Sequence, residues 1–307
     1  MTRIVFMGTP DFAVPSLRKL QKSDHQIVSV VTVPDRPQGR GRKLTASAIK
    51  VAAHELALPV LQPESISDPD FIHEIKSLEP DLIVVVAFQI LPPELYGLPA
   101  RGSFNLHASL LPRYRGAAPI HWALLNGDTE SGVTTFFLQR KVDTGSMLLQ
   151  RSVPIQPEDN LGSLHDKLAA VGADVVLETV NGIAEQNLTT TAQDNGLATR
   201  APKVGAEDRQ LNFAEDVEQC NNRIRAFAPR PGAITSYAGQ SIKILKATPV
   251  AGTGAPGEIL QADSSALVIA CGTDALAVHE IQPEGKRAMP VADFLHGNTI
   301  LPGATFG

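Results

Sequence analysis

The segment "NLHASLLPRYRGAAPIHWAL", residues 105–124, places several side chains that can do chemistry close together. Asn105 and His107 lie two residues apart, and a serine, a proline and two arginines follow them. An amide can donate a hydrogen bond to a developing oxyanion, and a histidine can move a proton near neutral pH. On a strand, residues two apart point to the same face. The pair therefore suits either group-transfer chemistry or a structural role, and taken alone the structural role is the commoner one.

Asp143, in "KVDTGSML", is a second candidate. An Asp-Thr-Gly sequence after a strand forms a tight turn, because the aspartate side chain bonds to the backbone two residues on. The same carboxylate could also orient a histidine or stabilise its charge. The residues alone do not decide between these two interpretations.

The hydrophobic pattern predicts the elements that would position these residues. Runs rich in apolar and β-branched residues predict strands at 3–8, 26–33, 81–88 and 102–109, and helical spacing predicts helices at 12–21, 44–58, 68–78 and 161–183. Such alternation predicts an α/β fold with a Rossmann-like, mostly parallel, doubly wound sheet. Ligands bind at the carboxyl ends of the strands in such sheets, which is where Asn105 and His107 are expected.

The pattern changes after a polar stretch broken by glycine and proline at 184–205. Beyond it, a helix at 216–227 precedes several short strand-like runs, which predict a small β-barrel. We therefore expect a catalytic domain at 1–184, a linker at 185–206 and a C-terminal domain at 207–307.

Composition excludes several classes of protein. A net charge of -5 means that nucleic acid could bind only at a local basic patch. The apolar run at the start of the sequence is too short for a signal peptide. No apolar run in the chain approaches the roughly 18 residues that a membrane helix needs. The two cysteines form no CxxC pair, which favours reduced thiols in the cytoplasm.

Three common kinds of site lack their motifs. The eight histidines form no HxxH or HxxxH pair, so no metal site is predicted. The chain has no GxSxG segment for a serine nucleophile. Gly8 is the one glycine of the first strand-to-helix turn, and Pro10 removes an N–H there, so a dinucleotide site is not predicted.

A basic segment, "PDRPQGRGRKL" at 34–44, is the exception in an acidic chain. Its prolines and glycines predict a protruding loop. Its four cations suit contacts to a phosphate backbone, although a solvated loop tip would have the same composition. The candidate nucleic-acid contacts are Arg36, Arg40, Arg42 and Lys43.

These segments together resemble the methionyl-tRNA formyltransferase family. The matching motifs are "VFMGTPDFAVPSL", "PDRPQGRGRKL", "NLHASLLPRYRGAAPI", "DTG", "IRAFAPRPGA", "PGEIL", "IQPEGKRAM" and "DFLHG", in the family's order over nearly the whole chain. The pattern NLHxSLLPxYRGAAPI is specific for enzymes that use 10-formyltetrahydrofolate and does not by itself identify the acceptor of the formyl group.

The resemblance implies a Rossmann-like formyltransferase domain, a linker and a C-terminal OB-like β-barrel that binds tRNA. It implies transfer of the formyl group of 10-formyltetrahydrofolate to the α-amino group of methionine on the initiator tRNA, with no metal, by a cytoplasmic monomer. The family's catalytic asparagine, histidine and aspartate correspond to Asn105, His107 and Asp143.

The resemblance also implies two folate-binding segments. "SLLP" corresponds to Ser109, Leu110, Leu111 and Pro112, and "AFQILP" includes Phe88 and Ile90. The second segment is one residue shorter than the family's usual AYGLILP. The approach to Asp143 is "LQRKVDTG", with Arg140 and Lys141, where the family usually has MDxGLDTG.

The C-terminal part carries nine Lys and Arg against eleven Asp and Glu over residues 201–307. A strongly basic tRNA platform is therefore not expected there, and a narrower stripe would consist of Arg223, Arg225, Arg230, Lys243 and Lys246.

Three other functions share the same catalytic residues or fold. One is formyl transfer to a small-molecule amine, such as a nucleotide-sugar or glycinamide ribonucleotide. A second is hydrolysis of 10-formyltetrahydrofolate, and a third is RNA binding by an inactive scaffold. The basic segment and the separate C-terminal domain favour a tRNA acceptor over the first, and the intact Asn105, His107 and Asp143 set disfavours the third.

Overall fold

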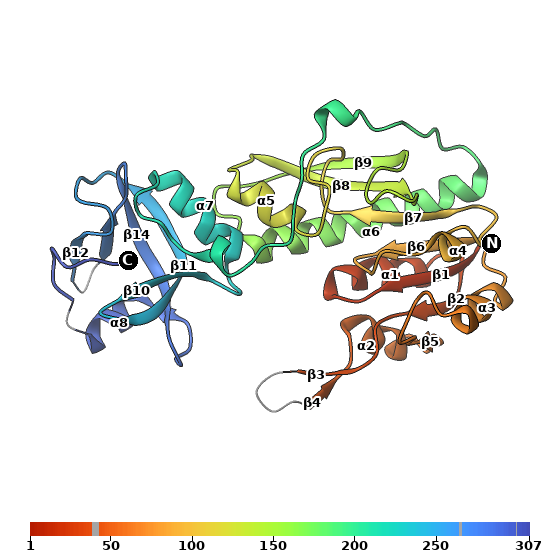
Figure 1. Ribbon diagram of the computed structural model, residues 1–307, viewed down its shortest axis with the longest axis horizontal. Helices are drawn as coiled ribbons and strands as arrows, with labels where there is room; N and C mark the ends of the chain where they lie inside the picture. The colour runs from red at the N-terminus through yellow and green to blue at the C-terminus, as the bar shows by residue number, and fades with distance from the viewer. Residues whose placement is uncertain (39–42, 264–265, 299) are drawn as a thin grey trace. The chain divides into compact units, whose positions relative to one another are not determined.

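The computed structural model describes residues 1–38, 43–263, 266–298 and 300–307 (Figure 1). The chain divides into two compact units. The first unit comprises 1–117, 131–154 and 165–201, and the second comprises 118–130, 155–164 and 202–307. Two short segments within the predicted catalytic domain, 118–130 and 155–164, thus belong to the compact unit that contains the C-terminal region.

A seven-stranded sheet, in the order β5-β2-β1-β6-β7-β8-β9, forms the first unit (Figure 1). Its parallel strands are β1 (Arg3–Gly8), β2 (Gln26–Val31), β5 (Val60–Leu61), β6 (Leu82–Val86) and β7 (Ser103–His107). Antiparallel to β7 runs β8 (Glu130–Phe137), followed by β9 (Met147–Pro154). The predicted Rossmann-like, mostly parallel sheet is confirmed.

Helices cover both faces of this sheet. They are η1 (Asp11–Ala13), α1 (Val14–Gln21), α2 (Ala48–Glu55), α3 (Pro69–Ser77), α4 (Pro93–Tyr96) and α6 (Leu161–Glu185). On one face α6 packs closely on β7, since a Cβ built at Gly172 would lie 2.7 Å from Cδ2 of Leu106. On the other face, alternate β1 and β6 residues share a core with Phe71 and Ile75 of α3.

The basic segment predicted as a loop contains a short hairpin. β3 (Arg36–Gln38) pairs antiparallel with β4 (Lys43–Thr45), with Arg36 opposite Thr45. The predicted helix at 44–58 accordingly begins later, at Ala48, where the Ser47 side chain accepts a hydrogen bond of 3.0 Å from the Lys50 N–H. That cap satisfies one of the free amides of the first turn. Arg40 and Arg42 lie outside the described residues.

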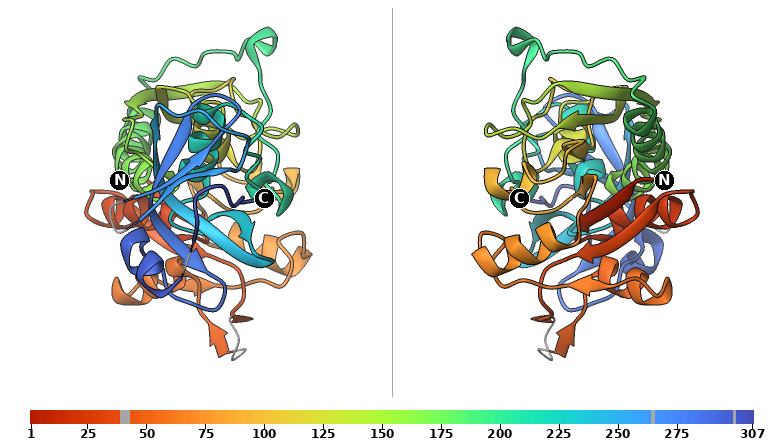
Figure 2. Two further views of the ribbon diagram at one scale, coloured as in Figure 1. Left: turned by 90° about the vertical axis from the view of Figure 1, so that its left-hand side faces the viewer. Right: turned by 90° about the vertical axis from the view of Figure 1, so that its right-hand side faces the viewer.

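The second unit is built on an antiparallel sheet in the order β10-β11-β14-β13-β12, with β15 beside β14. Figure 2 draws the later strands of this sheet in blue. The strands are β10 (Ala233–Tyr237), β11 (Gln240–Val250), β12 (Ile259–Ala262), β13 (Leu267–Ala270), β14 (Ala275–Pro283) and β15 (Met289–Pro290). Its helices are α5 (Pro119–Leu125), η3 (Glu207–Arg209), α7 (Val217–Phe227) and α8 (Val291–Gly297). The prediction of a small C-terminal β domain is confirmed, and its strands form an antiparallel sheet.

The last residues of the chain join the two edges of this sheet. The Phe306 N–H donates to the carbonyl of Gly257, just before β12, and the Gly307 N–H donates to Ser236 of β10. These bonds of 2.8 and 3.0 Å satisfy edge groups that would otherwise lie unpaired. Among the described helices of both units, none has the length and apolar character needed to cross a membrane.

Candidate active site

β7 presents Asn105 and His107 on one face of the sheet. In the strand register Asn105 lies beside Val85 of β6, and Leu106 lies on the opposite face against α6. β6 ends beside Leu106, so His107 lies at the carboxyl end of the parallel strands. The strand alternation thus places the two polar side chains where open α/β sheets bind ligands.

The His107 imidazole is buried and contacted through both ring nitrogens. Its Nε2 lies 2.8 Å from the carbonyl oxygen of Tyr114. Because a carbonyl only accepts, Nε2 carries the proton in this contact. Its Nδ1 lies 3.9 Å from Oδ2 of Asp143, and the two side chains are only 7% and 12% exposed. The separation exceeds a direct hydrogen bond, and it places a negative charge beside a nitrogen that can accept a proton.

Unusual backbone conformations bring both partners to the ring. Tyr114 and Asp143 are non-glycine residues with φ of 60° and 54°, in the left-handed region that such residues seldom adopt. Gly116 has a φ of 132°, and its N–H donates a hydrogen bond of 2.9 Å to Oδ2 of Asp143. The loop after β7 therefore holds the histidine through Tyr114 and the aspartate through Gly116.

Asn105 differs from its neighbours in having an uncommitted side chain. It is half-buried, and its carboxamide makes no hydrogen bond to any described residue. A strand-end amide in that state has a free N–H donor to offer a ligand. This is what the oxyanion role predicted from the sequence requires.

The segment Ser109–Pro112 forms a braced turn beside β8. The Ser109 hydroxyl is fully buried and donates a hydrogen bond of 2.7 Å to the carbonyl of Arg113. Thr134 donates to the Ser109 carbonyl and accepts from the Leu111 N–H. The Ser109 and Leu111 side chains are thus inside the fold, whereas Leu110 and Pro112 are half-buried.

The other predicted folate segment follows β6. Phe88 is half-buried against the core on the α3 face, and Ile90 is 73% exposed. Because β6 and β7 are adjacent and parallel, the segments that follow them begin at the same edge of the sheet. The structure thus places Phe88 near that edge and leaves Ile90 as a large apolar side chain in solvent.

The segment that contains the predicted nucleic-acid contacts is anchored just before β3. Asp35 accepts hydrogen bonds from Lys50, at 2.7 Å, and from Gln62, at 2.9 Å. The Lys50 hydrogen bond lowers the pKa of Asp35, so the carboxylate stays charged. Arg36 is exposed in β3, and Lys43 begins β4.

Part of the predicted linker packs against the first unit. We call residues 191–201 the strap. The Thr191 N–H bonds to Met147 at the start of β9, and the Ala201 N–H bonds to Arg115 in the loop after β7. The polar residues of this segment predict a linker. Here they make hydrogen bonds instead, and a search for hydrophobic periodicity does not detect such bonds.

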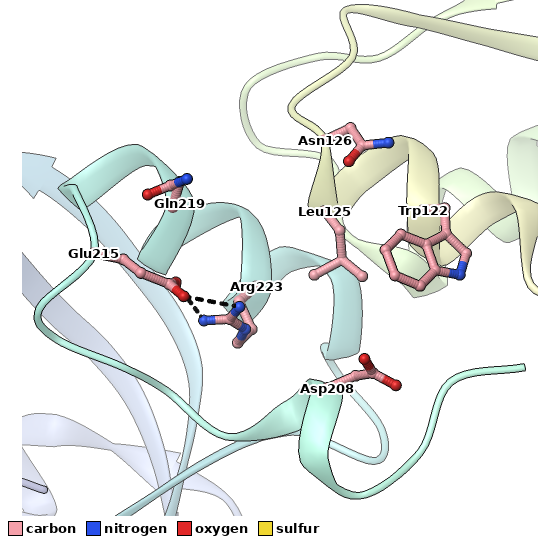
Figure 3. A pocket seen from close by; sticks show the side chains of 7 residues that line it. All are labelled: Trp122, Leu125, Asn126, Asp208, Glu215, Gln219 and Arg223. Carbon is pink, nitrogen blue, oxygen red and sulfur yellow. Dashed lines mark hydrogen bonds and ion pairs between the residues drawn. The ribbon is translucent and has the colours of Figure 1, made fainter. Parts of the chain in front are cut away.

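A pocket in the second unit lies between α5 and α7 (Figure 3). None of the predicted catalytic or folate-binding residues lines it; its lining consists of Trp122, Leu125, Asn126, Asp208, Glu215, Gln219 and Arg223. Two members of the predicted basic stripe are engaged within this unit. Arg223 is paired with Glu215 at 2.5 Å, and Arg225 donates to the backbone carbonyls of Gln156 and Asp159. Burial lowers the pKa of the Arg225 guanidinium.

Comparison with known families decides how this site is classified. The formyl transferase family model matches residues 2–180, and the formyl transferase C-terminal domain model matches residues 203–299. The chain belongs to the formyl transferase family. Two of its relatives are named methionyl-tRNA formyltransferase. The Geobacter sulfurreducens protein is 44% identical over 306 residues, covering 99% of this chain and 96% of that protein. The Moorella thermoacetica protein is 44% identical over 308 residues, with 99% of both chains covered.

Solved structures share the fold of this formyl transferase at lower identity. HypX from Aquifex aeolicus, in complex with tetrahydrofolic acid, aligns with a TM-score of 0.67 and 19% identity, over 96% of this chain and 47% of that one. WlaRD, a sugar 3N-formyl transferase, aligns with a TM-score of 0.67 and 22% identity, over 94% and 99%. At these identities the likeness shows the fold alone.

Gly116→Ala tests whether the loop after β7 needs a glycine. A Cβ at Gly116 would lie 2.4 Å from the carbonyl oxygen of Ala201, so the loop must shift, and we expect the shift to disturb the hydrogen bond from the Gly116 N–H to Asp143. A hydrogen bond to a charged group contributes about 1.5–3 kcal/mol, so we expect kcat/KM for formyl transfer to fall about tenfold or more.

Gly239→Ala is the matched control, because Gly239 also has a positive φ, of 78°, but nothing lies within 4 Å of its added Cβ. It should lose stability from backbone strain and keep its activity. Equal activity of the two variants would show that the Gly116 contact does not matter.

Proposed function

We propose that this formyl transferase moves the formyl group of 10-formyltetrahydrofolate to the α-amino group of methionyl-tRNA, giving N-formylmethionyl-tRNA for translation initiation. The observation that carries the proposal is the 44% identity to methionyl-tRNA formyltransferases over 99% of the chain. Both the catalytic unit and the C-terminal unit are part of that match. The proposal includes a cytoplasmic location and a monomeric state, for which the family resemblance is the support.

10-Formyltetrahydrofolate supplies the formyl group as a substrate. Asn105 acts on the formyl oxygen, because attack by the amine places negative charge there and the uncommitted amide can donate to it. The half-buried position of Asn105 strengthens that bond relative to one in water. In this proposal the apolar contacts to the folate come from Leu110, Pro112, Phe88 and Ile90. The buried side chains of Ser109 and Leu111 support the turn that carries the first two.

His107 handles the proton in the proposed reaction. Its Nε2–H is committed to the Tyr114 carbonyl, so Nδ1 is the atom that accepts a proton from the attacking amine, directly or through water. The Asp143 carboxylate, 3.9 Å from Nδ1, stabilises the imidazolium that forms. As the new amine–carbon bond forms and the carbon–nitrogen bond to the folate breaks, Nδ1 returns the proton to the departing folate nitrogen. The acid and base functions thus belong to one ring atom.

The acceptor and the two catalytic side chains are tested together in one assay. Purified protein is given 10-formyltetrahydrofolate with initiator Met-tRNA, elongator Met-tRNA, a small-molecule amine or water alone. We expect formyl transfer to initiator Met-tRNA, reduced about 100- to 1,000-fold in kcat by Asn105→Ala and about 100- to 10,000-fold by His107→Ala. Asn187→Ala, at an exposed asparagine outside the site, should leave kcat unchanged. Near-normal turnover by both site variants, or equal transfer to water, would refute the proposal.

The basic hairpin is tested by its effect on tRNA alone. In the proposal Arg36, Arg40, Arg42 and Lys43 contact tRNA phosphates, so each contact removed should reduce the salt dependence of tRNA use. We expect Arg40→Gln with Arg42→Gln to raise KM for tRNA, to leave KM for the folate unchanged, and to lower the slope of log(kcat/KM) against log salt by about one per lost contact.

Lys22→Gln with Lys76→Gln removes the same charge from exposed positions away from the hairpin. If both double variants change the tRNA kinetics equally, the hairpin has no specific role and only net charge matters.

A further inference from the structure

The strap contacts both loops that hold His107. At one end, Thr191 and Met147 exchange two backbone hydrogen bonds of 2.9 and 2.8 Å. At the other end, the Arg115 N–H donates to Thr199 and the Ala201 N–H donates to Arg115, at 2.9 and 2.8 Å. Met147 lies four residues after Asp143, and Arg115 directly follows Tyr114. Each of the two partners of the imidazole is therefore next to a segment that the strap holds.

Gln193 connects the two loops through one side chain. Its Nε2 donates to the backbone carbonyls of Asp143 and Gly145, at 3.0 and 2.9 Å. Its Oε1 accepts from Nε and Nη2 of Arg115, at 3.0 and 2.7 Å. Both N–H donors and the oxygen of the amide are thus in use. A half-buried glutamine with every polar group engaged fixes the distance between the loops it joins.

Local backbone energetics explain why the loops need such a support. Asp143 has a φ of 54° and Tyr114 a φ of 60°, which non-glycine residues keep only when surrounding contacts impose them. Gln193 binds the carbonyl of Asp143 itself, and the Thr199 hydroxyl accepts a hydrogen bond of 2.8 Å from the Tyr114 N–H. Strap side chains thus bind the main chain of both residues in the left-handed conformation.

We propose that Gln193 is a positioning residue, and that the strap sets the distance between Asp143 and His107 by holding both loops. The proposal rests on the proposed function for its kinetic consequence only. Without the Gln193 amide, Asp143 and Gly145 lose two donors, and the Asp143 carboxylate turns away from Nδ1. The proton transfer step is then slowed while the folate-binding segments, which Gln193 does not touch, are unchanged.

The kinetic test compares Gln193→Ala with Leu197→Ala, an exposed strap position whose side chain is 64% exposed. We expect Gln193→Ala to lower kcat about 100-fold, as a displacement of about 1 Å does in an active site, with KM for the folate within twofold of the unchanged chain. Leu197→Ala should keep both values. Wild-type kcat in Gln193→Ala would overturn the proposal.

Two more substitutions separate the bonds of the strap. Gln193→Glu keeps an acceptor for Arg115 but loses both donors to the Asp143 and Gly145 carbonyls, so it should lose at least as much kcat as Gln193→Ala. Thr199→Val removes only the acceptor for the Tyr114 N–H and is the variant to use should Gln193→Ala fail to fold. Wild-type kcat in either Gln193→Glu or Thr199→Val would overturn the proposal.

Amide hydrogen exchange at Gly116, whose N–H donates to Asp143, gives a readout that does not depend on the reaction. It should be faster in Gln193→Ala than in Leu197→Ala. If the wild-type protein transfers no formyl group, the proposed function is refuted, but the hydrogen-exchange comparison still tests the positioning role. Equal exchange in the two variants would refute the positioning role whatever the reaction proves to be.

Discussion

The site depends on one buried imidazole held between a carbonyl and a carboxylate. His107 donates from Nε2 to Tyr114 and faces Asp143 with Nδ1, and both contacts lie inside the protein. In such an environment charges act strongly on one another, so an imidazolium that forms there is stabilised chiefly by the carboxylate beside it. One histidine can then accept and return a proton at the same atom, provided that the Asp143 oxygen stays in place.

Groups from separate parts of the chain keep the Asp143 oxygen in place beside His107. β7 supplies the histidine, the loop after β7 supplies Tyr114 and Gly116, and the turn before β9 supplies Asp143. Tyr114 and Asp143 are non-glycine residues with left-handed backbones, which no strand or helix would impose. Hydrogen bonds between loops must therefore do the positioning, and much of the polar character of the strap follows from that need.

The sequence predicted what hydrophobic spacing and strand alternation control. The alternating strands and helices of the first unit, the shared face of Asn105 and His107, and the short strands of the C-terminal domain depend on burial, and apolar patterns record burial. The strap was predicted as a linker because Gln193 acts through hydrogen bonds, which leave no periodic trace. β3 and β4 lie in a segment that was predicted as a loop, because its glycines and prolines masked two very short strands. Ser109 was predicted as a folate contact from resemblance, which does not reveal that its hydroxyl points inward to Arg113.

Nitrogen NMR of the imidazoles tests the central claim most directly. In a ¹⁵N-labelled full chain at a pH of about 8, where ordinary histidines are neutral, the His107 signal is assigned by its loss in His107→Gln. The account predicts a ring protonated at Nε2 and bare at Nδ1, with an Nε2 proton that exchanges slowly because it is bonded to Tyr114 inside the fold. A ring protonated at Nδ1 and not at Nε2 would contradict the account. Nε2 would then have no proton to donate to the Tyr114 carbonyl, and the nitrogen beside Asp143 could not accept one.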